Sequence, residues 1–289
     1  MKQRFRAVNF RRASLERIAF CNEIIEDYQA QDLRLTLRQL YYQLVSRNII
    51  PNVEKSYKNL STLVSDARLA GLMDWDAIED RVRTPRKASD WLNVKDLAES
   101  ALAVFRLPRW DRQKNYVELW VEKDALAGVL DPIARKYHIT LMVNRGYSSQ
   151  SAMHESAVRF ESEGAERQKT LLYLGDHDPS GEDMVRDVRS RLLMFGVTRL
   201  TVSKVALTID QVDQYDPPPN PAKLTDPRSK LYMRKHGSSS WEVDALPPEV
   251  LTSIITKELE KLIDWKKMKA VIAEEESGKR KLREAMAYL

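Results

Sequence analysis

Apolar residues recur at helical spacing in three segments of the N-terminal third of the chain. The first segment covers residues 14–28, and Ser14 is its candidate N-cap. The second covers residues 37–48 and follows Thr36, whose hydroxyl can accept a hydrogen bond from a free backbone N–H of the first turn. The third covers residues 53–70. The pattern therefore predicts three short helices.

Beyond residue 112 the pattern changes, and short runs of β-forming residues alternate with helical periods. The predicted strands are residues 116–121, 139–143, 170–175 and 199–206. The predicted helices between them are residues 124–136, 150–163 and 181–195. Alternation with short connections predicts a mainly parallel sheet flanked by helices, and active groups in such sheets lie at the carboxyl ends of the strands.

The remaining residues are less regular. Proline and glycine-serine stretches frame an irregular loop at 217–240. Its basic residues are Lys223, Arg228, Lys230, Arg234, Lys235 and His236. This loop is either a plain surface loop or a segment that closes on phosphates. After it, the pattern predicts a short strand at 241–246 and a final amphipathic helix at about 249–273.

The polar, proline-containing segment 107–115 separates the two patterns, so we place a domain boundary near residue 112. Residues 1–112 are expected to form a mostly α, winged-helix-like DNA-binding domain with a basic N-terminal arm, because a basic, turn-prone segment at 81–90 follows the three helices. An ordinary helical bundle is the alternative. Residues 113–289 are expected to form an α/β domain with a C-terminal helix.

Charge is distributed unevenly along the chain. Residues 1–115 contain 21 Lys and Arg against 15 Asp and Glu, whereas the remainder contains 26 against 27. A basic N-terminal part favours a polyanionic partner such as double-stranded DNA, although proteins that bind no nucleic acid can have a similar excess. Cys21 is the single cysteine, and no apolar run approaches the roughly 18 residues of a membrane span. We therefore expect a cytoplasmic, nucleoid-associated protein that contacts no membrane.

Candidate DNA-binding residues follow from the same distribution. The first twelve residues contain five basic and two aromatic side chains, which suits an arm on a phosphate backbone or a solvated terminus. The third predicted helix contains further basic residues. The candidates are Arg4, Arg6, Arg11, Arg12, Lys55, Lys58, Arg68 and, beside the first acidic strand end, Lys123.

Acidic residues stand where two of the predicted strands end. Glu122 follows one strand, and Asp176 and Asp178 follow another. Residues two apart on an extended chain point the same way, so both aspartates can face one ion. Magnesium prefers oxygen ligands and is commonly held by a few carboxylates together with substrate phosphate. These three acids therefore predict a Mg²⁺ site that Mn²⁺ can also occupy, whereas a capped turn is the simpler explanation of the Asp-x-Asp pair alone.

Further acids are weaker candidates for the same site. Glu182 follows the Asp-Pro-Ser-Gly turn and can reach an ion through water, but the helix dipole alone also explains an acid there. Glu242 and Asp244 share one face of the predicted strand 241–246 and are candidates for extending the metal site or for holding a second ion.

The order of these motifs resembles the Toprim domain of topoisomerases, bacterial primases and OLD-type nucleases. The motifs are Glu122-Lys-x-Ala-Leu after a strand, Gly146-Tyr-Ser-Ser-Gln, and Gly175-Asp-x-Asp-Pro-Ser-Gly. Among Toprim proteins the chain is most similar to the topoisomerase VI A subunit and its meiotic double-strand-break relatives. Residues 35–45 resemble the Arg-x-x-Tyr-Tyr helix of that family's winged-helix domain, and the segment from Trp241 resembles another part of it. The likeness covers most of residues 30–250.

The resemblance implies a homodimer that cleaves double-stranded DNA with a metal ion. By motif position Tyr42 is the nucleophile, which forms a 5′-phosphotyrosyl bond and frees a 3′-hydroxyl, while Tyr41 belongs to the core. Arg38 lies one helical turn before Tyr42 and is expected to hold the scissile phosphate. Glu122 is expected to act with the metal, which in this family lies in the partner subunit's Toprim domain.

Two other functions remain open. A Toprim nuclease would keep the carboxylates, hydrolyse DNA with a metal-activated water and use Tyr42 as a DNA contact. A non-catalytic DNA-binding or assembly protein would use the same fold without chemistry. The chain also contains no ATPase domain of the kind that the B subunit of topoisomerase VI contributes, so strand passage is not implied and a separate ATPase subunit is a candidate partner.

Overall fold

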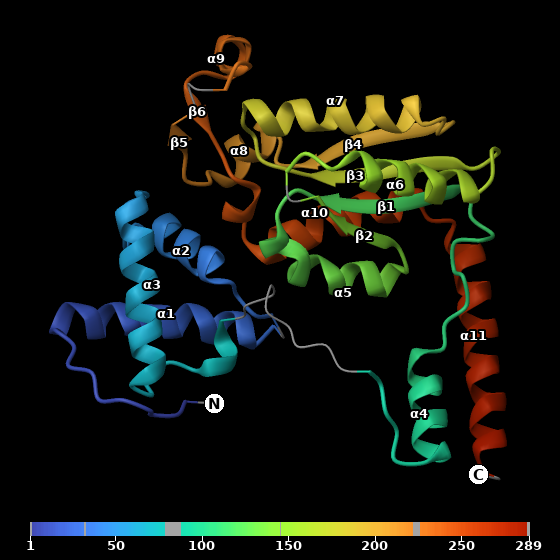
Figure 1. Ribbon diagram of the computed structural model, residues 1–289, viewed down its shortest axis with the longest axis horizontal. Helices are drawn as coiled ribbons and strands as arrows, with labels where there is room; N and C mark the ends of the chain where they lie inside the picture. Colours follow the sequence, from blue (N-terminus) through green and yellow to red (C-terminus); the bar gives the residue numbers. More distant parts are fainter. Residues whose placement is uncertain (1, 32, 79–87, 145, 222–225, 288–289) are drawn as a thin grey trace.

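A four-stranded parallel sheet organises the larger region of the molecule (Figure 1). The computed structural model describes residues 2–31, 33–78, 88–144, 146–221 and 226–287. The strands are β1 (Asn115–Val121), β2 (Thr140–Val143), β3 (Gln168–Leu174) and β4 (Leu200–Ala206), in the order β2-β1-β3-β4. The predicted parallel sheet is confirmed, and each strand lies within two residues of its predicted bounds.

Alternate residues of the strands face two different helical layers, because successive side chains of a strand point to opposite faces. Tyr116 and Trp120 of β1 pack in one core cluster, whereas Val117 and Leu119 pack in the other. The layers consist of α6 (Gln150–Ser162) and α7 (Pro179–Met194) on one face, and α5 (Ala127–Tyr137) and α10 (Pro248–Leu262) on the other. The sheet is therefore buried on both faces, as its apolar strands predict.

Three helices form the N-terminal region, as predicted. They are α1 (Arg12–Gln29), α2 (Leu37–Ser46) and α3 (Glu54–Leu69), followed by the single turn η1 (Trp75–Ala77). Thr36 caps α2 in a reciprocal capping box with Gln39, which confirms its predicted role. The predicted cap Ser14 is wrong, because α1 already begins at Arg12 and Arg11 occupies the N-cap position without a side-chain hydrogen bond. The predicted basic turn at 81–90 falls mostly outside the described residues.

Two predictions for the C-terminal part are wrong. Residues 241–246 form no regular strand: Trp241 makes an isolated bridge with His177, and η3 (Val243–Ala245) is a single 3₁₀ turn. The final helix is also not continuous, because α10 ends at Leu262 and α11 (Trp265–Met286) begins after a break. At this break the side chain of Asp264 caps α11. The side chain of Gln113 accepts from the Asp264 backbone N–H at 2.8 Å and donates to the Asp264 backbone C=O at 3.0 Å.

The predicted irregular loop at 217–240 contains more structure than expected. Residues 229–236 form helix α9 (Ser229–His236), and the pair β5 (Asn220–Pro221) and β6 (Ser239–Ser240) brings the ends of the segment together. The predicted 124–136 helix begins with the 3₁₀ turn η2 (Asp124–Leu126), and α4 (Val94–Val104) and α8 (Ile209–Tyr215) are helices with no predicted counterpart. None of the helices in the described ranges combines the length and apolar character needed to cross a membrane.

The N-terminal helices contact the carboxyl edge of the sheet rather than one of its faces. Helix α2 packs against η3, and Ala245 of η3 belongs to the same core cluster as the side chains of α1 to α3. Asn52, which precedes α3, donates to Asn220 Oδ1 at 2.8 Å. At the opposite end of the molecule, α4 lies against α11 (Figure 1). The docking of α2 therefore brings its polar side chains to the edge where the strands end.

Candidate active site

The ends of β1 and β3 are neighbours, which places Glu122 beside Asp176. The two strands pair in parallel up to Val121 and Leu174, and the Glu122 N–H donates to Leu174 O at 2.9 Å. The Asp176 N–H then donates to Glu122 Oε2 at 3.1 Å. Gly175 permits this approach, because a Cβ at residue 175 would lie 2.9 Å from the same carboxylate oxygen. The sequence-based expectation that these two acids meet at one sheet edge is consistent with this geometry.

Three carboxylates gather next to this point. Single oxygens of Asp176, Glu242 and Asp244 lie within 4.8 Å of one another, and this is the acid cluster. Asp176 and Asp244 are 7 % and 2 % exposed, whereas Glu242 is half-buried. The backbone N–H of Val243 donates to Asp176 Oδ1 at 2.8 Å, so the 3₁₀ turn η3 is attached to the loop after β3. The turn, rather than a strand, therefore positions Glu242 and Asp244.

Two cations hold the acid cluster together. Lys123 Nζ lies 2.8 Å from Asp176 Oδ1 and 2.8 Å from Asp244 Oδ1, and it also contacts Glu242. Arg38 of α2 donates through Nε to Asp244 Oδ2 at 2.8 Å and through its NH2 group to Glu242. Three carboxylates thus share two cations in a largely buried place.

The pKa values of the two buried aspartates move in opposite directions. Burial raises the pKa of Asp176 above its ordinary value, despite its contact with Lys123. For Asp244, burial again opposes ionisation, but the combined attraction of Lys123 and Arg38 lowers the pKa below its ordinary value. Asp244 is therefore the firmly ionised member of the cluster, and Asp176 is the member whose charge is least compensated.

Tyr42 lies beside the acid cluster in the same chain. It is 4 % exposed, and its hydroxyl accepts a hydrogen bond from the Arg38 NH2 group at 3.1 Å. Burial raises the pKa of Tyr42, while Arg38 pulls that pKa down. Tyr41 points elsewhere, because its hydroxyl donates to Asn52 Oδ1 at 2.9 Å and its ring packs against Tyr57. The expected division between a core tyrosine and a site tyrosine is consistent with these contacts.

Glu122 lines a cleft that opens onto the acid cluster. The cleft has a volume of about 430 Å³, and Arg38, Lys123, Asp176 and Gly146 also line it. Burial and the nearby Asp176 carboxylate raise the pKa of Glu122 to about 7. A carboxyl group with such a pKa exchanges its proton near neutral pH, which suits a general acid or base.

The other two predicted acids have local partners. Asp178 caps α7, because its Oδ1 accepts from the Gly181 N–H at 2.6 Å and from the Ser180 hydroxyl at 2.9 Å. Glu182 accepts from Lys204 Nζ at 2.6 Å. Among the described residues, neither belongs to the acid cluster. The structure therefore groups Asp176 with Glu242 and Asp244 more closely than with Asp178.

The predicted DNA-binding residues differ in whether their charged groups already have partners within the chain. Lys55 is exposed and has no ion pair within the described ranges, whereas Arg68 bonds to the backbone oxygens of Trp75 and Ile78, at 2.7 Å for the latter. Three of the other candidates form ion pairs with nearby acids: Arg6 with Asp66, Arg12 with Glu16 and Lys58 with Glu54. The backbone of Arg4 pairs with Ala70, and Arg11 directly precedes α1. Lys123 is inside the acid cluster.

One residue near the site had no useful sequence signal. Asn220 hydrogen-bonds the Tyr42 side chain and also receives a hydrogen bond from Asn52. It stands in a proline-rich run, where an asparagine is read as part of a turn. The pairing of β5 with β6 brings it over α2.

In comparisons with known protein families and with curated proteins, no match to this chain was found.

Proposed function

We propose that this protein is a magnesium-dependent DNA-cleaving enzyme of the topoisomerase VI A type, in which Tyr42 attacks a phosphodiester. One observation carries the proposal: the Arg38 guanidinium contacts the Tyr42 hydroxyl and also Asp244 and Glu242. A candidate nucleophile, a cation suited to phosphate and a set of oxygen ligands therefore lie in direct contact. This combination matches the needs of phosphoryl transfer more closely than those of a structural ion cluster.

The acid cluster has the composition that a hard divalent cation requires. Asp176, Glu242 and Asp244 offer carboxylate oxygens within 4.8 Å of one another, and Asp176 and Glu242 line an open cleft. The three acids outnumber the two cations that contact them, so the cluster retains negative charge. A bound Mg²⁺ or Mn²⁺ would supply charge stabilisation for the phosphate and the leaving oxygen.

The chain's own residues account for the remaining requirements of the reaction. Burial raises the pKa of Tyr42, and Arg38 partly offsets this rise and is positioned to bind a phosphate oxygen. The Tyr42 hydroxyl gives up its proton to water in the cleft, its oxygen forms a bond to phosphorus, the bond from phosphorus to the 3′-oxygen breaks, and that oxygen takes up a proton. Glu122, with its pKa near 7, is the candidate group for delivering this proton. The products are a 5′-phosphotyrosyl bond and a free 3′-hydroxyl.

The geometry also bears on the proposed homodimer. The family resemblance implies that the tyrosine of one subunit works with the metal site of its partner. In this structure Tyr42 lies beside the acid cluster of its own chain, through Arg38. One chain therefore offers a complete set of groups, and we propose that two copies act on the two strands of a duplex.

The N-terminal region is proposed to bind the duplex as a winged-helix domain. Its three helices and the exposed Lys55 on α3 support a helix that approaches the major groove. Arg4, Arg6, Arg11 and Arg12 precede or begin α1 and remain proposed contacts to the phosphate backbone. A nucleoid-associated location would follow from this binding.

Hydrolysis is the second candidate function, and Glu122 is the observation that favours it. Tyr42 is almost fully buried, whereas Glu122 lines the open cleft and has a pKa of about 7. A carboxylate of that kind can take a proton from a water molecule that attacks the phosphate. In this case Tyr42 would contact DNA without forming a covalent bond.

A covalent-adduct assay tests the proposal. Duplex DNA without nicks, labelled at its 3′ ends, is incubated with the protein and Mg²⁺, and denaturing gels are run with and without protease digestion. Label that remains on the protein until digestion, and that is lost in Tyr42→Phe, is the expected result. Tyr41→Phe is the matched control, because Tyr41 is adjacent in sequence and also buried but does not contact Arg38.

Two results would decide against tyrosine chemistry. Free fragments produced by Tyr42→Phe at the wild-type rate would establish hydrolysis instead. Absence of any cleavage by the wild-type protein with Mg²⁺ and with Mn²⁺ would support the non-catalytic DNA-binding function.

A further inference from the structure

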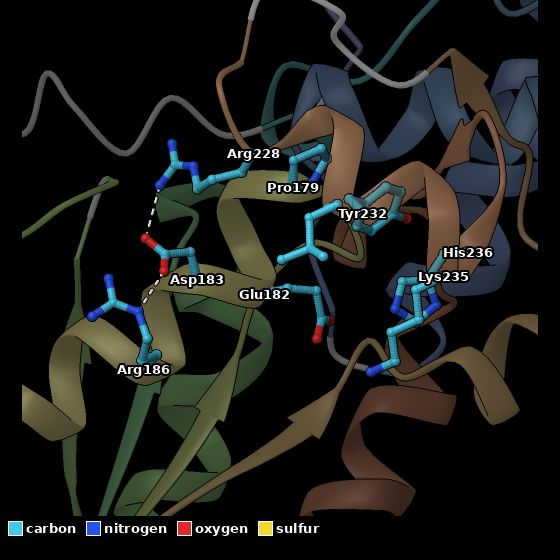
Figure 2. A pocket seen from close by; sticks show the side chains of 9 residues that line it. Pro179, Glu182, Asp183, Arg186, Arg228, Tyr232, Lys235 and His236 are labelled. Atoms are coloured by element: carbon cyan, nitrogen blue, oxygen red, sulfur yellow. Dashed lines mark hydrogen bonds and ion pairs between the residues drawn. The ribbon is translucent and has the colours of Figure 1, made fainter.

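A second cavity lies between the start of α7 and helix α9 (Figure 2). Its volume is about 240 Å³. Pro179, Leu231 and the ring of Tyr232 give it an apolar surface, and Leu231 is 74 % exposed. Large apolar side chains that stay this exposed beside a cavity are typical of binding sites.

The acids in the wall of this pocket are already neutralised. Asp183 accepts hydrogen bonds from Arg186 Nε at 2.6 Å and from the Arg228 NH1 group at 2.9 Å, and Figure 2 shows these three side chains on one side of the pocket. Glu182 is bound by Lys204 at 2.6 Å. Neither acid therefore presents an unbalanced negative charge to a ligand.

Helix α9 adds positive charge that has no acidic partner. Lys235 lines the pocket on the side opposite to Arg186 (Figure 2). Lys230, Arg234 and Lys235 are exposed, and within the described ranges none of them forms an ion pair with a carboxylate. Lys235 is the one of these three that lines the pocket, and the other two add positive charge along the same helix, which makes this side of the pocket attractive to an anion.

Aromatic rings form a rigid part of the pocket. The Tyr232 hydroxyl donates to His177 O at 2.8 Å and lies 2.7 Å from His177 Nδ1, so the ring is fixed. The His236 ring packs at 5.0 Å from the Tyr232 ring and at 4.7 Å from the His177 ring. Flat rings beside exposed apolar atoms and cations are the combination with which proteins bind the bases and phosphates of single strands.

Two loops border both the pocket and the cleft of the candidate active site. Gly146 lines the cleft, and the next residue, Tyr147, donates from its hydroxyl to Asp183 of the pocket at 2.8 Å. In the second loop, Asp178 caps α7 directly before Pro179. The same two loops thus border both cavities, which places the pocket next to the cleft.

We propose that this pocket binds one nucleotide of the DNA strand that the candidate active site acts on. The base lies against the exposed Leu231 side chain, beside Pro179 and the edge of the largely buried Tyr232 ring, and the phosphate lies near Lys235. Arg228 is already paired with Asp226 and Asp183, so it shapes the wall of the pocket instead of supplying a free charge. This assignment rests on the proposed function, because it takes DNA as the substrate. It adds a subsite that determines how a single strand leaves the cleft.

Binding of a fluorescein-labelled single-stranded oligodeoxynucleotide in EDTA, followed by anisotropy, tests the pocket without any cleavage. Leu231→Ala and Lys235→Glu should each raise the dissociation constant by about fivefold or more. The matched controls are Leu193→Ala on α7, which is also an exposed leucine, and Lys257→Glu on α10, which makes the same charge change on an exposed lysine. The controls should bind like the wild type.

Three further probes sharpen the assignment. An abasic oligonucleotide should bind the wild type about as weakly as the intact one binds Leu231→Ala. Equal binding of abasic and intact strands, equal loss in pocket and control variants, or no binding by the wild type would each overturn the proposal. Tighter binding of a ribo-oligonucleotide would reject DNA, and displacement by an equimolar deoxynucleoside monophosphate would reassign the pocket to free nucleotides.

The outcome is independent of the chemistry at Tyr42. A protein that shows this binding pattern but forms no covalent adduct and no fragments would disprove the proposed function and retain the pocket. A protein that cleaves DNA but binds equally well with Lys235→Glu and Lys257→Glu would retain the function and lose the pocket.

Discussion

Two groups of buried carboxylates lie on the same sheet, and they are satisfied in different ways. Glu118, in the middle of β1, is 0 % exposed. It accepts hydrogen bonds from Tyr116 and Trp120, each at 2.7 Å, and from Arg159 at 2.6 and 2.9 Å. One carboxylate thus meets four donor groups and has no opening to solvent. This is the arrangement of a structural ion pair, in which every lone pair is used.

The acid cluster at the carboxyl edge has the opposite balance. Three carboxylates share Lys123 and Arg38, and the cluster borders an open cleft. Its acids are crowded, so burial and mutual repulsion work against their ionisation, as the raised pKa of Asp176 indicates. The comparison teaches that burial of an acid is not itself a sign of function. An excess of acids over cations, next to a cleft, is the informative feature.

The largest expected effect separates the two groups by activity. Asp176→Asn should lower the single-turnover rate of DNA cleavage by about 10²–10³-fold, because it removes charge from the proposed metal ligands. Glu118→Gln, measured on its folded fraction, should cleave at nearly the wild-type rate. Cleavage by Asp176→Asn at the wild-type rate would remove the functional distinction between the groups.

The second largest expected effect is a difference in the free energy of unfolding between a variant of Glu118 and a variant of the acid cluster. Glu118→Gln should lower the free energy of unfolding by about 1–3 kcal/mol, because the buried Glu118 is the charged acceptor for Tyr116, Trp120 and the partly exposed Arg159. Glu242→Gln should change it by less than about 1 kcal/mol, because Glu242 is partly exposed and its removal relieves repulsion. Urea denaturation followed by tryptophan fluorescence measures both values. The reverse ranking would mean that the acid cluster is the structural one.

The third effect is stabilisation by metal. Mg²⁺ at about 100 times its dissociation constant should raise the free energy of unfolding by about 2.7 kcal/mol if it binds only the folded protein. The increase should persist in Glu118→Gln and disappear in Asp244→Asn. Calorimetry at several Mg²⁺ concentrations reports it, and an equal increase in both variants would assign the ion to another place.

The smallest effect is a pH dependence at Glu122. Its pKa is raised from 4.5 to about 7 in the folded protein, so the folded state holds a proton that the unfolded state releases between these values. The wild type should therefore lose stability relative to Glu122→Gln as pH rises from about 4.5 to about 7, and the difference should level off above pH 7. Urea midpoints at pH 5 and pH 8 in EDTA test this. Parallel behaviour of the two proteins would show that the Glu122 carboxyl is not perturbed.

The sheet and part of the site could be predicted because their signals are local. The strands have continuous apolar runs, and parallel pairing of adjacent strands necessarily brings Glu122 and Asp176 to one edge. The same local reasoning failed at residues 241–246, where an alternating pattern suggested a strand. The 3₁₀ turn there is fixed by a distant partner, since the Val243 N–H binds Asp176. Tertiary contacts override the local preference in such a segment.

The contacts of Arg38 could not be predicted from the sequence. Its partner Asp244 is 206 positions away, and no periodicity links residues at that separation. The sequence placed Arg38 next to Tyr42 by helical spacing, and the structure adds that the same guanidinium reaches the acid cluster. For Asp178 the two explanations weighed from sequence were an ion ligand and a capped turn, and its hydrogen bond to the Gly181 N–H supports the turn.

The docking of α2 on η3 determines when, during synthesis of the chain, the candidate site can be assembled. A growing polypeptide carries Tyr42 and Arg38 long before residue 244 leaves the ribosome. Until then the tyrosine has no carboxylates beside it, however well the first helices have folded. The contacts that join Tyr42, Arg38 and Asp244 therefore form only after residue 244 has been synthesised, and shorter translation products lack them.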